Sequence, residues 1–268
     1  MRTIVHLSDL HFGRVHMPTL APLRAAVEAV HPDLVAISGD LTQRARTAQF
    51  KEARAFLDSL PHPQIVVPGN HDVPLFNVVT RVAQPLARYR RYITDDLAPS
   101  FVDDEIAVLG LNTTRAFVHK GGRVNEKQLS EICDDFGRLA GSQTRIVVTH
   151  HPFDIPEGAK ESDIVGRARV AMAMFATCGV DLFLAGHLHL THHGNTARYQ
   201  IPGYSALAVQ AGTATSTRGR GEENSFNLIR VERPRIAIES HAWQPSALRF
   251  ALTDTSVFTH SAAGWAPA

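Results

Sequence analysis

Five short polar segments of this 268-residue sequence carry side chains that can bind metal ions or transfer protons. In chain order they are Asp9-Leu10-His11, Gly39-Asp40, Gly69-Asn70-His71-Asp72, His150-His151-Pro152 and Gly186-His187-Leu188-His189. Carboxylate, amide and imidazole groups suit Mn, Fe, Zn and similar divalent ions, so the segments do not indicate a soft cysteine-based zinc site. Alternate side chains of an extended segment share a face, so the Asp-x-His and His-x-His spacings let both residues reach one ion.

The number of candidate ligands indicates more than one metal ion. The seven candidates are Asp9, His11, Asp40, Asn70, His150, His187 and His189. A mononuclear site has about four to six ligands and does not need seven side chains. Two ions that share Asp40 would use all seven. Two-metal sites with ions ~3.5–4 Å apart are typical of phosphoester chemistry.

Each polar segment follows a short apolar run that predicts a buried strand, either directly or after one intervening residue. The predicted strands before the five segments span 3–7, 33–37, 64–67, 145–149 and 182–185, with helical spacing between several of them. Strand–helix repetition with near-continuous apolar strands predicts parallel strands covered by helices. Ligands bind in the crevice at the carboxyl ends of such strands. We therefore expect an α/β fold of two facing sheets, with one domain over 1–245 and a loosely packed tail over 246–268.

Composition limits the classes of partner. Lys plus Arg number 27 and Asp plus Glu 26, a balance that argues against a protein that coats nucleic acid or anionic lipid. No run of ~18 apolar residues predicts a membrane span, and no secretory leader is visible, so we expect a cytoplasmic protein. Cys133 and Cys178 are expected to be small buried residues in a reducing compartment.

The five segments, in this order, resemble the signature of the calcineurin-like metallophosphoesterases, from Asp9 to His189. The resemblance implies a four-layer α-β-β-α sandwich, two facing mixed sheets flanked by helices. It implies a first metal held by Asp9, His11, Asp40 and His189, and a second held by Asp40, Asn70, His150 and His187. The segments SDLHFG, SGDLT, PGNHDVP and AGHLH look most like those of the bacterial class III cyclic-nucleotide phosphodiesterases.

The resemblance also implies an activity. We expect a dinuclear phosphodiesterase in which a metal-bridging hydroxide attacks a small phosphodiester, with Mn and/or Fe as the metals and Zn or Co as alternatives. Cyclic nucleotides are the first candidate substrates; glycerophosphodiesterase or broad-specificity phosphohydrolase activity is the alternative. A non-catalytic scaffold is disfavoured because all seven ligands and His71 are present. We expect no stable nucleic-acid partner and no membrane, and the relatives suggest a homodimer or higher homo-oligomer.

His71 corresponds to the family's histidine that binds no metal and lies near the leaving group. A positioned acid helps an alkoxide to leave, so His71 is the candidate catalytic residue, with Asp72 orienting or charging its ring. A purely structural role for His71 is the alternative.

Candidate substrate-binding residues are Asn112, His151 and Arg218. Asn112 follows a strand and either bonds a phosphate oxygen or is an ordinary turn asparagine. Arg218 belongs to a polar loop with Arg220 that either folds over the site or stays solvated. His192 and His193 are expected in an exposed loop. No clustered arginines are recognisable beside the ligands, which favours diesters over monoesters.

Overall fold

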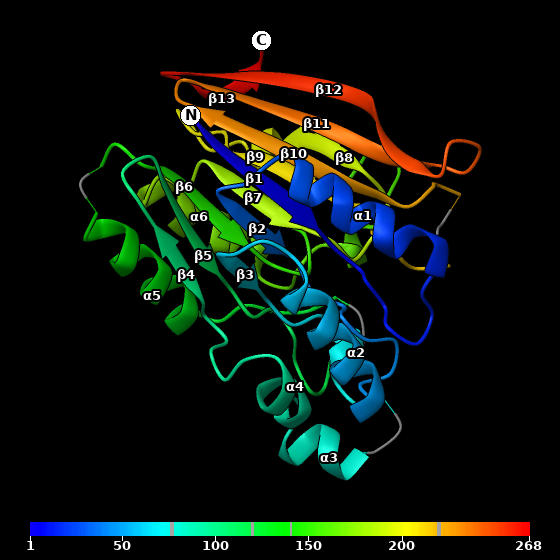
Figure 1. Cartoon of the computed structure of the whole chain (residues 1–268). Coiled ribbons are helices and arrows are strands. Elements are labelled where there is room, and N and C mark those ends of the chain that lie inside the picture. Colours follow the sequence, from blue (N-terminus) through cyan, green and yellow to red (C-terminus); the bar gives the residue numbers. More distant parts are fainter. Residues whose placement is uncertain (76–77, 119–120, 140, 219–220) are drawn as a thin grey trace.

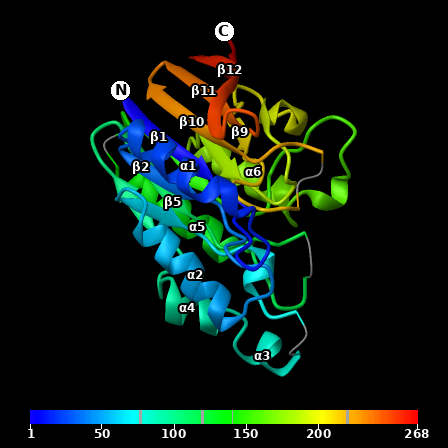
Figure 2. The same cartoon turned by 45° about the vertical axis from the view of Figure 1, so that its right-hand side comes forward.

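Two β-sheets lie face to face with helices on their outer sides in the computed structural model of this chain (Figure 1). The structure describes residues 1–268 except 76–77, 119–120, 140 and 219–220. Both termini lie at one end of the sandwich, and two short helices lie at the opposite end (Figure 2). The expected arrangement of two mixed sheets flanked by helices is confirmed.

The first sheet has seven strands in the order β13-β12-β11-β10-β1-β2-β3. They are β1 (Arg2–Leu7), β2 (Leu34–Ile37), β3 (Gln64–Val66), β10 (Ser225–Glu232), β11 (Arg235–Gln244), β12 (Arg249–Ser261) and β13 (Gly264–Pro267). Strands β1, β2 and β3 are parallel, and β10 to β13 continue the sheet antiparallel. The N-terminal strand therefore occupies the middle of this sheet, between β2 and β10.

The second sheet has six strands in the order β4-β5-β6-β7-β9-β8. They are β4 (Ser100–Val102), β5 (Ile106–Gly110), β6 (Thr144–Val148), β7 (Leu182–Ala185), β8 (His192–Asn195) and β9 (Leu207–Gln210). The four central strands are parallel, and β4 and β8 are antiparallel edges. In both sheets, the carboxyl ends of the parallel strands carry the polar segments.

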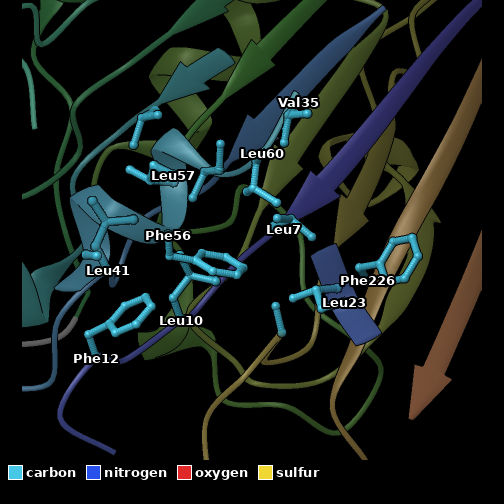
Figure 3. Close-up of a cluster of buried hydrophobic side chains, with 14 of the residues drawn as sticks. Leu7, Leu10, Phe12, Leu23, Val35, Leu41, Phe56, Leu57, Leu60 and Phe226 are labelled. Atoms are coloured by element: carbon cyan, nitrogen blue, oxygen red, sulfur yellow. The ribbon is translucent and has the colours of Figure 1, made fainter. Parts of the chain in front are cut away.

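Helices cover the outer face of each sheet. The helices are α1 (Met17–Ala29), α2 (Thr47–Asp58), α3 (Val78–Ala83), α4 (Ala87–Tyr92), α5 (Glu126–Gly137) and α6 (Ala168–Thr177), with single 3-10 turns at η1 (Asn70–Asp72), η2 (Glu161–Asp163) and η3 (Thr196–Tyr199). Helices α1 and α2 pack on the first sheet, where Leu23 and Leu57 approach Leu7 and Val35 (Figure 3). Helices α5 and α6 pack on the second sheet. No described helix is long and apolar enough to cross a bilayer.

The strands are buried on both faces because the sheets also pack on each other. In β1, Val5 and Leu7 face the helices, and Ile4 faces the other sheet, where it joins Val148 and Leu184. This double burial explains why the strands appear in the sequence as continuous apolar runs.

The expectation of a loosely packed tail over 246–268 is wrong. This segment contains all of β12 and β13, and both Phe258 and Trp265 are buried in the core between the sheets. The Trp265 indole Nε1 donates to Asp181 Oδ1 at 2.9 Å. Most other side chains of β12 are at least partly exposed, which is why small and polar residues conceal the strand in the sequence.

The expectation of two unpaired cysteines is also wrong. Cys133 in α5 and Cys178 at the end of α6 form a disulfide, with their Cα atoms 5.2 Å apart. Helices α5 and α6 pack against each other and bring the two residues together across 45 positions of sequence. This proximity depends on tertiary packing, which spacing alone does not reveal.

Candidate metal centre and active site

The predicted ligands lie at one edge of the sandwich, in loops that follow parallel strands. Asp9 and His11 follow β1, and Asp40 follows β2. Backbone hydrogen bonds join these two loops: Asp9 N donates to Gly39 O at 3.1 Å, and His11 N donates to Asp40 O at 2.9 Å. Asn70 begins η1, His150 follows β6, and His187 and His189 follow β7.

One group of side chains consists of Asp9, His11, Asp40 and His189, whose candidate ligand atoms all lie within 4.8 Å of one another. His189 Nε2 lies 3.1 Å from Asp9 Oδ1, and His11 Nε2 lies 3.4 Å from the same oxygen. All four side chains are buried. Two carboxylates and two imidazoles thus converge on one point, a donor set suited to a divalent cation.

A second group adjoins the first. His150, His151 and His187 have ligand atoms within 4.8 Å of one another. Asn70 Oδ1 lies 3.1 Å from both His150 Nε2 and His187 Nδ1. His150 Nε2 is also 3.5 Å from Asp40 Oδ2, so the Asp40 carboxylate faces both groups.

The residues present fit metal ions. The buried Oδ1 of Asp9 has no hydrogen-bond donor among the described residues and faces two imidazole nitrogens. Burial raises the pKa of Asp9, but His189 and His11 outweigh it and hold that pKa well below its usual range. The pKa of Asp40 is also held below its usual range, because the neighbouring His150 outweighs the effect of burial. Ionised carboxylates buried among imidazoles are groups that a cation would stabilise.

The second group holds two imidazoles with opposite pKa shifts. Burial and the neighbouring His150 lower the pKa of His187 to about 3. Burial opposes protonation of His150 as well, but the Asp40 carboxylate raises its pKa to about 9. Imidazole binds a metal in its neutral form, so loading the centre requires His150 to give up its proton.

Five of the predicted ligands have left-handed backbone conformations. Their φ angles are 53° for Asp9, 50° for His11, 52° for Asp40, 75° for His187 and 58° for His189. This conformation costs a residue with a side chain ~1–2 kcal/mol and concentrates at functional sites. The tertiary contacts therefore impose the ligand directions.

Two glycines allow the loops to approach each other. A Cβ atom on Gly69 would overlap the Asp40 carboxylate, and one on Gly186 would overlap Ser8 Oγ and crowd Asp9. The bare backbone at these positions is thus a condition for bringing Asp9 and Asp40 into the centre.

A surrounding layer of hydrogen bonds orients the ligands. His150 Nδ1 donates to Ser38 O at 2.8 Å, and His189 Nδ1 donates to Arg218 O at 3.0 Å, so each ring turns Nε2 toward the centre. Asp9 Oδ2 accepts from Ser8 Oγ at 2.7 Å. Such outer partners fix the tautomer and direction of metal-binding histidines.

His71 lies beside the ligand groups and belongs to neither. Its backbone N donates to Asp40 Oδ1 at 2.7 Å, and its ring centroid is 5.0 Å from that of His11. Nδ1 donates to Gln43 O at 2.9 Å, and Nε2 accepts from Arg218 Nη1 at 3.0 Å. Burial lowers the pKa of His71, and the Arg218 charge acts in the same direction. The lowered pKa and the hydrogen bond from Arg218 to Nε2 both favour the neutral imidazole.

Asp72 does not orient the His71 ring as expected. Its Oδ1 accepts from Thr42 N and Thr42 Oγ1, both at 2.9 Å, and its Oδ2 accepts from Leu41 N at 3.1 Å and Gly69 N at 2.9 Å. Burial and the Asp40 carboxylate raise the pKa of Asp72 to about 7, against the effect of these donors. Asp72 thus ties the loop after Asp40 to the loop before Asn70.

The three predicted substrate-binding residues have different surroundings. Asn112 Oδ1 accepts from Thr114 N at 2.9 Å and from Thr114 Oγ1 at 2.7 Å, the pattern of an ordinary turn asparagine. His151 is buried, with Nδ1 2.7 Å from Thr113 Oγ1 and its ring centroid 4.7 Å from that of His187. Arg218 reaches His71, whereas Arg220 lies outside the described residues.

Sequence reasoning missed Arg44 and misplaced His193. Arg44 Nη1 lies 3.3 Å from His71 Nδ1 and donates to Gln43 O at 3.1 Å. Its position four residues after Asp40, in the same loop, is the signal that could have found it. The expectation of no clustered arginines is therefore wrong. His192 and His193 both lie in β8 and not in an exposed loop, and the His193 ring lies 3.1 Å from Ser256 Oγ.

The fold and the site define a class of protein. The model of the family described as calcineurin-like phosphoesterase matches residues 2–190. This match covers most of the chain and every predicted ligand. The chain belongs to the calcineurin-like phosphoesterase family, and we identify it as a hydrolase of phosphoric esters.

Curated relatives and solved structures resemble the chain as follows. A probable cyclic nucleotide phosphodiesterase of Synechococcus sp. is 31% identical over 78% of this chain and 81% of its own length. The 3′,5′-cyclic adenosine monophosphate phosphodiesterase of Escherichia coli (strain K12) is 25% identical over 69% of each chain. A glycerophosphodiester phosphodiesterase of Enterobacter lignolyticus is 30% identical over 60% of each. A dimetal phosphatase of Danio rerio shares the fold, with TM-score 0.69, 14% identity and coverage of 97% and 99%.

Proposed function

We propose that this chain is a dinuclear metal-dependent phosphodiesterase. The observation that carries the proposal is the pair of adjoining ligand groups with Asp40 facing both. Asp9, His11 and His189 would complete the first site, and Asn70, His150 and His187 the second. The oxygen and imidazole donors support Mn and/or Fe, with Zn or Co as alternatives.

Two bound cations would supply charge neutralisation of the phosphate oxygens and activation of a water. His71 then has the task of transferring a proton to the leaving alcohol oxygen. Its Nε2 already points toward Arg218, and its Nδ1–H is fixed by Gln43 O. To act as an acid, His71 must carry a proton on Nε2, the atom that accepts the hydrogen bond from Arg218. Arg218 therefore has to turn toward another acceptor.

The relatives support the choice of substrate. Two of those compared are named cyclic nucleotide phosphodiesterases and one a glycerophosphodiester phosphodiesterase. We therefore place small cyclic nucleotides first and glycerophosphodiesters second, with broad specificity as the alternative. A cytoplasmic location and a homo-oligomer are part of the same proposal.

The test is a substrate panel with Mn-reconstituted protein. The panel contains 3′,5′- and 2′,3′-cyclic nucleotides, a glycerophosphodiester, bis(p-nitrophenyl) phosphate and p-nitrophenyl phosphate. We expect turnover of at least one diester, with cyclic nucleotides first. Turnover of the monoester alone would contradict the phosphodiesterase proposal and leave the ligand groups unaffected.

A further inference from the structure

A cavity of about 660 Å³ lies between helix α4 and the segment 112–116 that follows β5. We call it the α4 cavity. Its volume falls within the range of about 300–1,000 Å³ that is typical of binding sites for small molecules. The described residues that line it include no predicted metal ligand, and they include neither His71 nor the two arginines beside it. The α4 cavity is therefore separate from the metal centre.

One wall of the α4 cavity has its other side toward the metal centre. Thr113 Oγ1 lies 2.7 Å from Nδ1 of His151, which belongs to the second group of imidazoles. The residues on either side of it, Asn112 and Thr114, line the α4 cavity. Thr113 thus faces the metal centre while its two neighbours face the cavity, so one thickness of backbone divides the two spaces.

The charged side chains of the α4 cavity are mainly positive. No carboxylate lies within 4 Å of three lining guanidinium groups among the described residues, those of Arg90, Arg91 and Arg115. Arg90 Nη1 donates to the backbone oxygen of Asp95 at 3.1 Å, and the Arg91 guanidinium lies 5.5 Å from the centre of the Tyr92 ring. Asp95 is the one acidic residue of the described lining. Three positive charges against one negative charge leave this lining with a net charge of +2.

Arg115 is the partly buried member of the three arginines. Its guanidinium donates to Asn112 O at 3.2 Å, to Thr114 O at 2.7 Å and to Gln128 Oε1. These acceptors are all neutral, and burial and the charge of Arg123 both lower the pKa of Arg115. An arginine nevertheless remains protonated in proteins. Its partly desolvated charge would be stabilised by an anion in the α4 cavity.

The remaining lining is largely apolar. Pro85 and Leu86 precede α4, and Leu97 lies in the segment after it. Leu86 is buried, so the apolar wall continues inward from the exposed arginines of α4. Guanidinium groups bind carboxylate and phosphate oxygens through planar, bidentate hydrogen bonds. A ligand that matches this lining therefore carries two negative charges on a compact apolar body.

We propose that the α4 cavity is a binding site for a small organic dianion with an apolar body. Arg115 binds the anion from the 112–116 wall, and Arg90 and Arg91 bind it from α4. The proposal does not depend on the function proposed for the metal centre, because binding in the α4 cavity needs neither metal nor turnover. A chain that hydrolyses no phosphodiester would still bind the dianion.

Calorimetric titration of the Mn-loaded protein at pH 8.5 tests the charge requirement. The probe is benzene-1,3-dicarboxylate, and its monomethyl ester has one charge fewer on the same ring. We expect the dianion to bind at least about tenfold more tightly, as the gain of a charge-assisted hydrogen bond implies. Equal affinity for the dianion and its monomethyl ester would overturn the proposal.

Removal of Mn tests the location of the bound anion. We expect the affinity for the dicarboxylate to change by less than about threefold, which is smaller than the usual effect of losing one bond to a charged group. Binding that disappears with Mn would place the anion at the metal centre and contradict the proposal.

A second probe distinguishes two kinds of dianion. Phenylphosphonate carries both charges on one group and is titrated in the metal-free protein. Tighter binding of the dicarboxylate would indicate a natural ligand with separated carboxylates, and tighter binding of the phosphonate would indicate a phosphate-like group. Either result supports the site, whereas failure of both dianions to bind would refute it.

Substitutions test the named residues. Arg91 has no hydrogen bond among the described residues, so we expect Arg91→Gln to leave the fold intact and to weaken dianion binding about tenfold. Arg115→Gln should weaken it by about 10- to 100-fold on the same grounds. Because Arg115 also holds the 112–116 wall, the thermal unfolding of each variant is measured.

The matched control is Arg88→Gln, which removes one positive charge from the same helix. Arg88 does not line the α4 cavity, and its Nη1 donates to Ala45 O at 2.9 Å. We expect this control to bind the dicarboxylate as the parent protein does. Unchanged affinity in both Arg91→Gln and Arg115→Gln, or an equal loss in Arg88→Gln, would overturn the assignment of the site.

Discussion

Asp72→Asn tests whether the metal centre depends on a buried carboxylate that touches no metal. Asp72 accepts four hydrogen bonds, two at each oxygen, and thereby joins the loop after Asp40 to Gly69. An asparagine of the same shape keeps one oxygen, which can still accept both bonds from Thr42. Its NH₂ group then faces the backbone N–H groups of Leu41 and Gly69.

The magnitude follows from those two donors. Each buried N–H left without an acceptor costs ~1–3 kcal/mol, so the two donors cost ~2–6 kcal/mol in the free energy of unfolding. The neutral side chain also removes the repulsion between Asp72 and Asp40, so we expect a net loss in the lower part of that range. For a chain of this size, each kcal/mol lowers Tm by ~2–4 °C. Metal affinity should fall as well, because the same bonds hold the loop that carries Asp40.

The assay is urea unfolding of metal-free protein at pH 8, above the pKa of about 7 for Asp72, with metal stoichiometry measured by elemental analysis. Asp58→Asn, at an exposed position in α2, is the control. A loss below ~0.5 kcal/mol, the usual range for a surface substitution, together with unchanged metal content, would refute the reasoning.

Further expectations concern other parts of the molecule. Asp40→Ala should abolish turnover and leave fewer than two metals per chain by elemental analysis; two retained ions with persisting turnover would show that the ligand assignment is wrong. His71→Ala should keep both metals and lose ~10²–10⁴ in turnover, less for a nitrophenolate leaving group; equal loss for good and poor leaving groups would argue against an acid. Trp265→Ala should cost ~3–5 kcal/mol in denaturant unfolding, whereas a loose tail would tolerate it. Chelation should lower the unfolding free energy, and Mn at 100 times its Kd should restore ~2.7 kcal/mol; identical melting with and without Mn would contradict this.

The sequence predicts the part of the fold that repeats a local pattern. Apolar runs followed by polar turns were enough to place β1, β2, β3, β6 and β7, because strands covered on both faces have a continuous apolar signal. The order of the polar turns then predicted the residues of the two ligand groups around Asp40. Both the strands and the polar turns are visible in the sequence because each depends on neighbours within a few residues.

The remainder depends on contacts between distant segments. The disulfide between Cys133 and Cys178 requires two helices to pack together. Most side chains of β12 are at least partly exposed, so the strand lacks the alternation of apolar and polar residues that would predict it. Arg44 and Arg218 are 174 positions apart in the numbering and meet only through His71. The left-handed φ of Asp9 is likewise unpredictable from its type, since the conformation is imposed by the assembled loops.

The place of β1 in its sheet has a consequence for the growing polypeptide. Residues 2–7 are made more than 200 residues before β10, so one edge of β1 stays open until residues 225–232 have left the ribosome. Closure of such a distant pair is slow because the long intervening loop must be ordered first. The nascent chain therefore displays an unpaired hydrophobic strand edge until β10 is available, and such edges are the kind of segment that chaperones shield from aggregation.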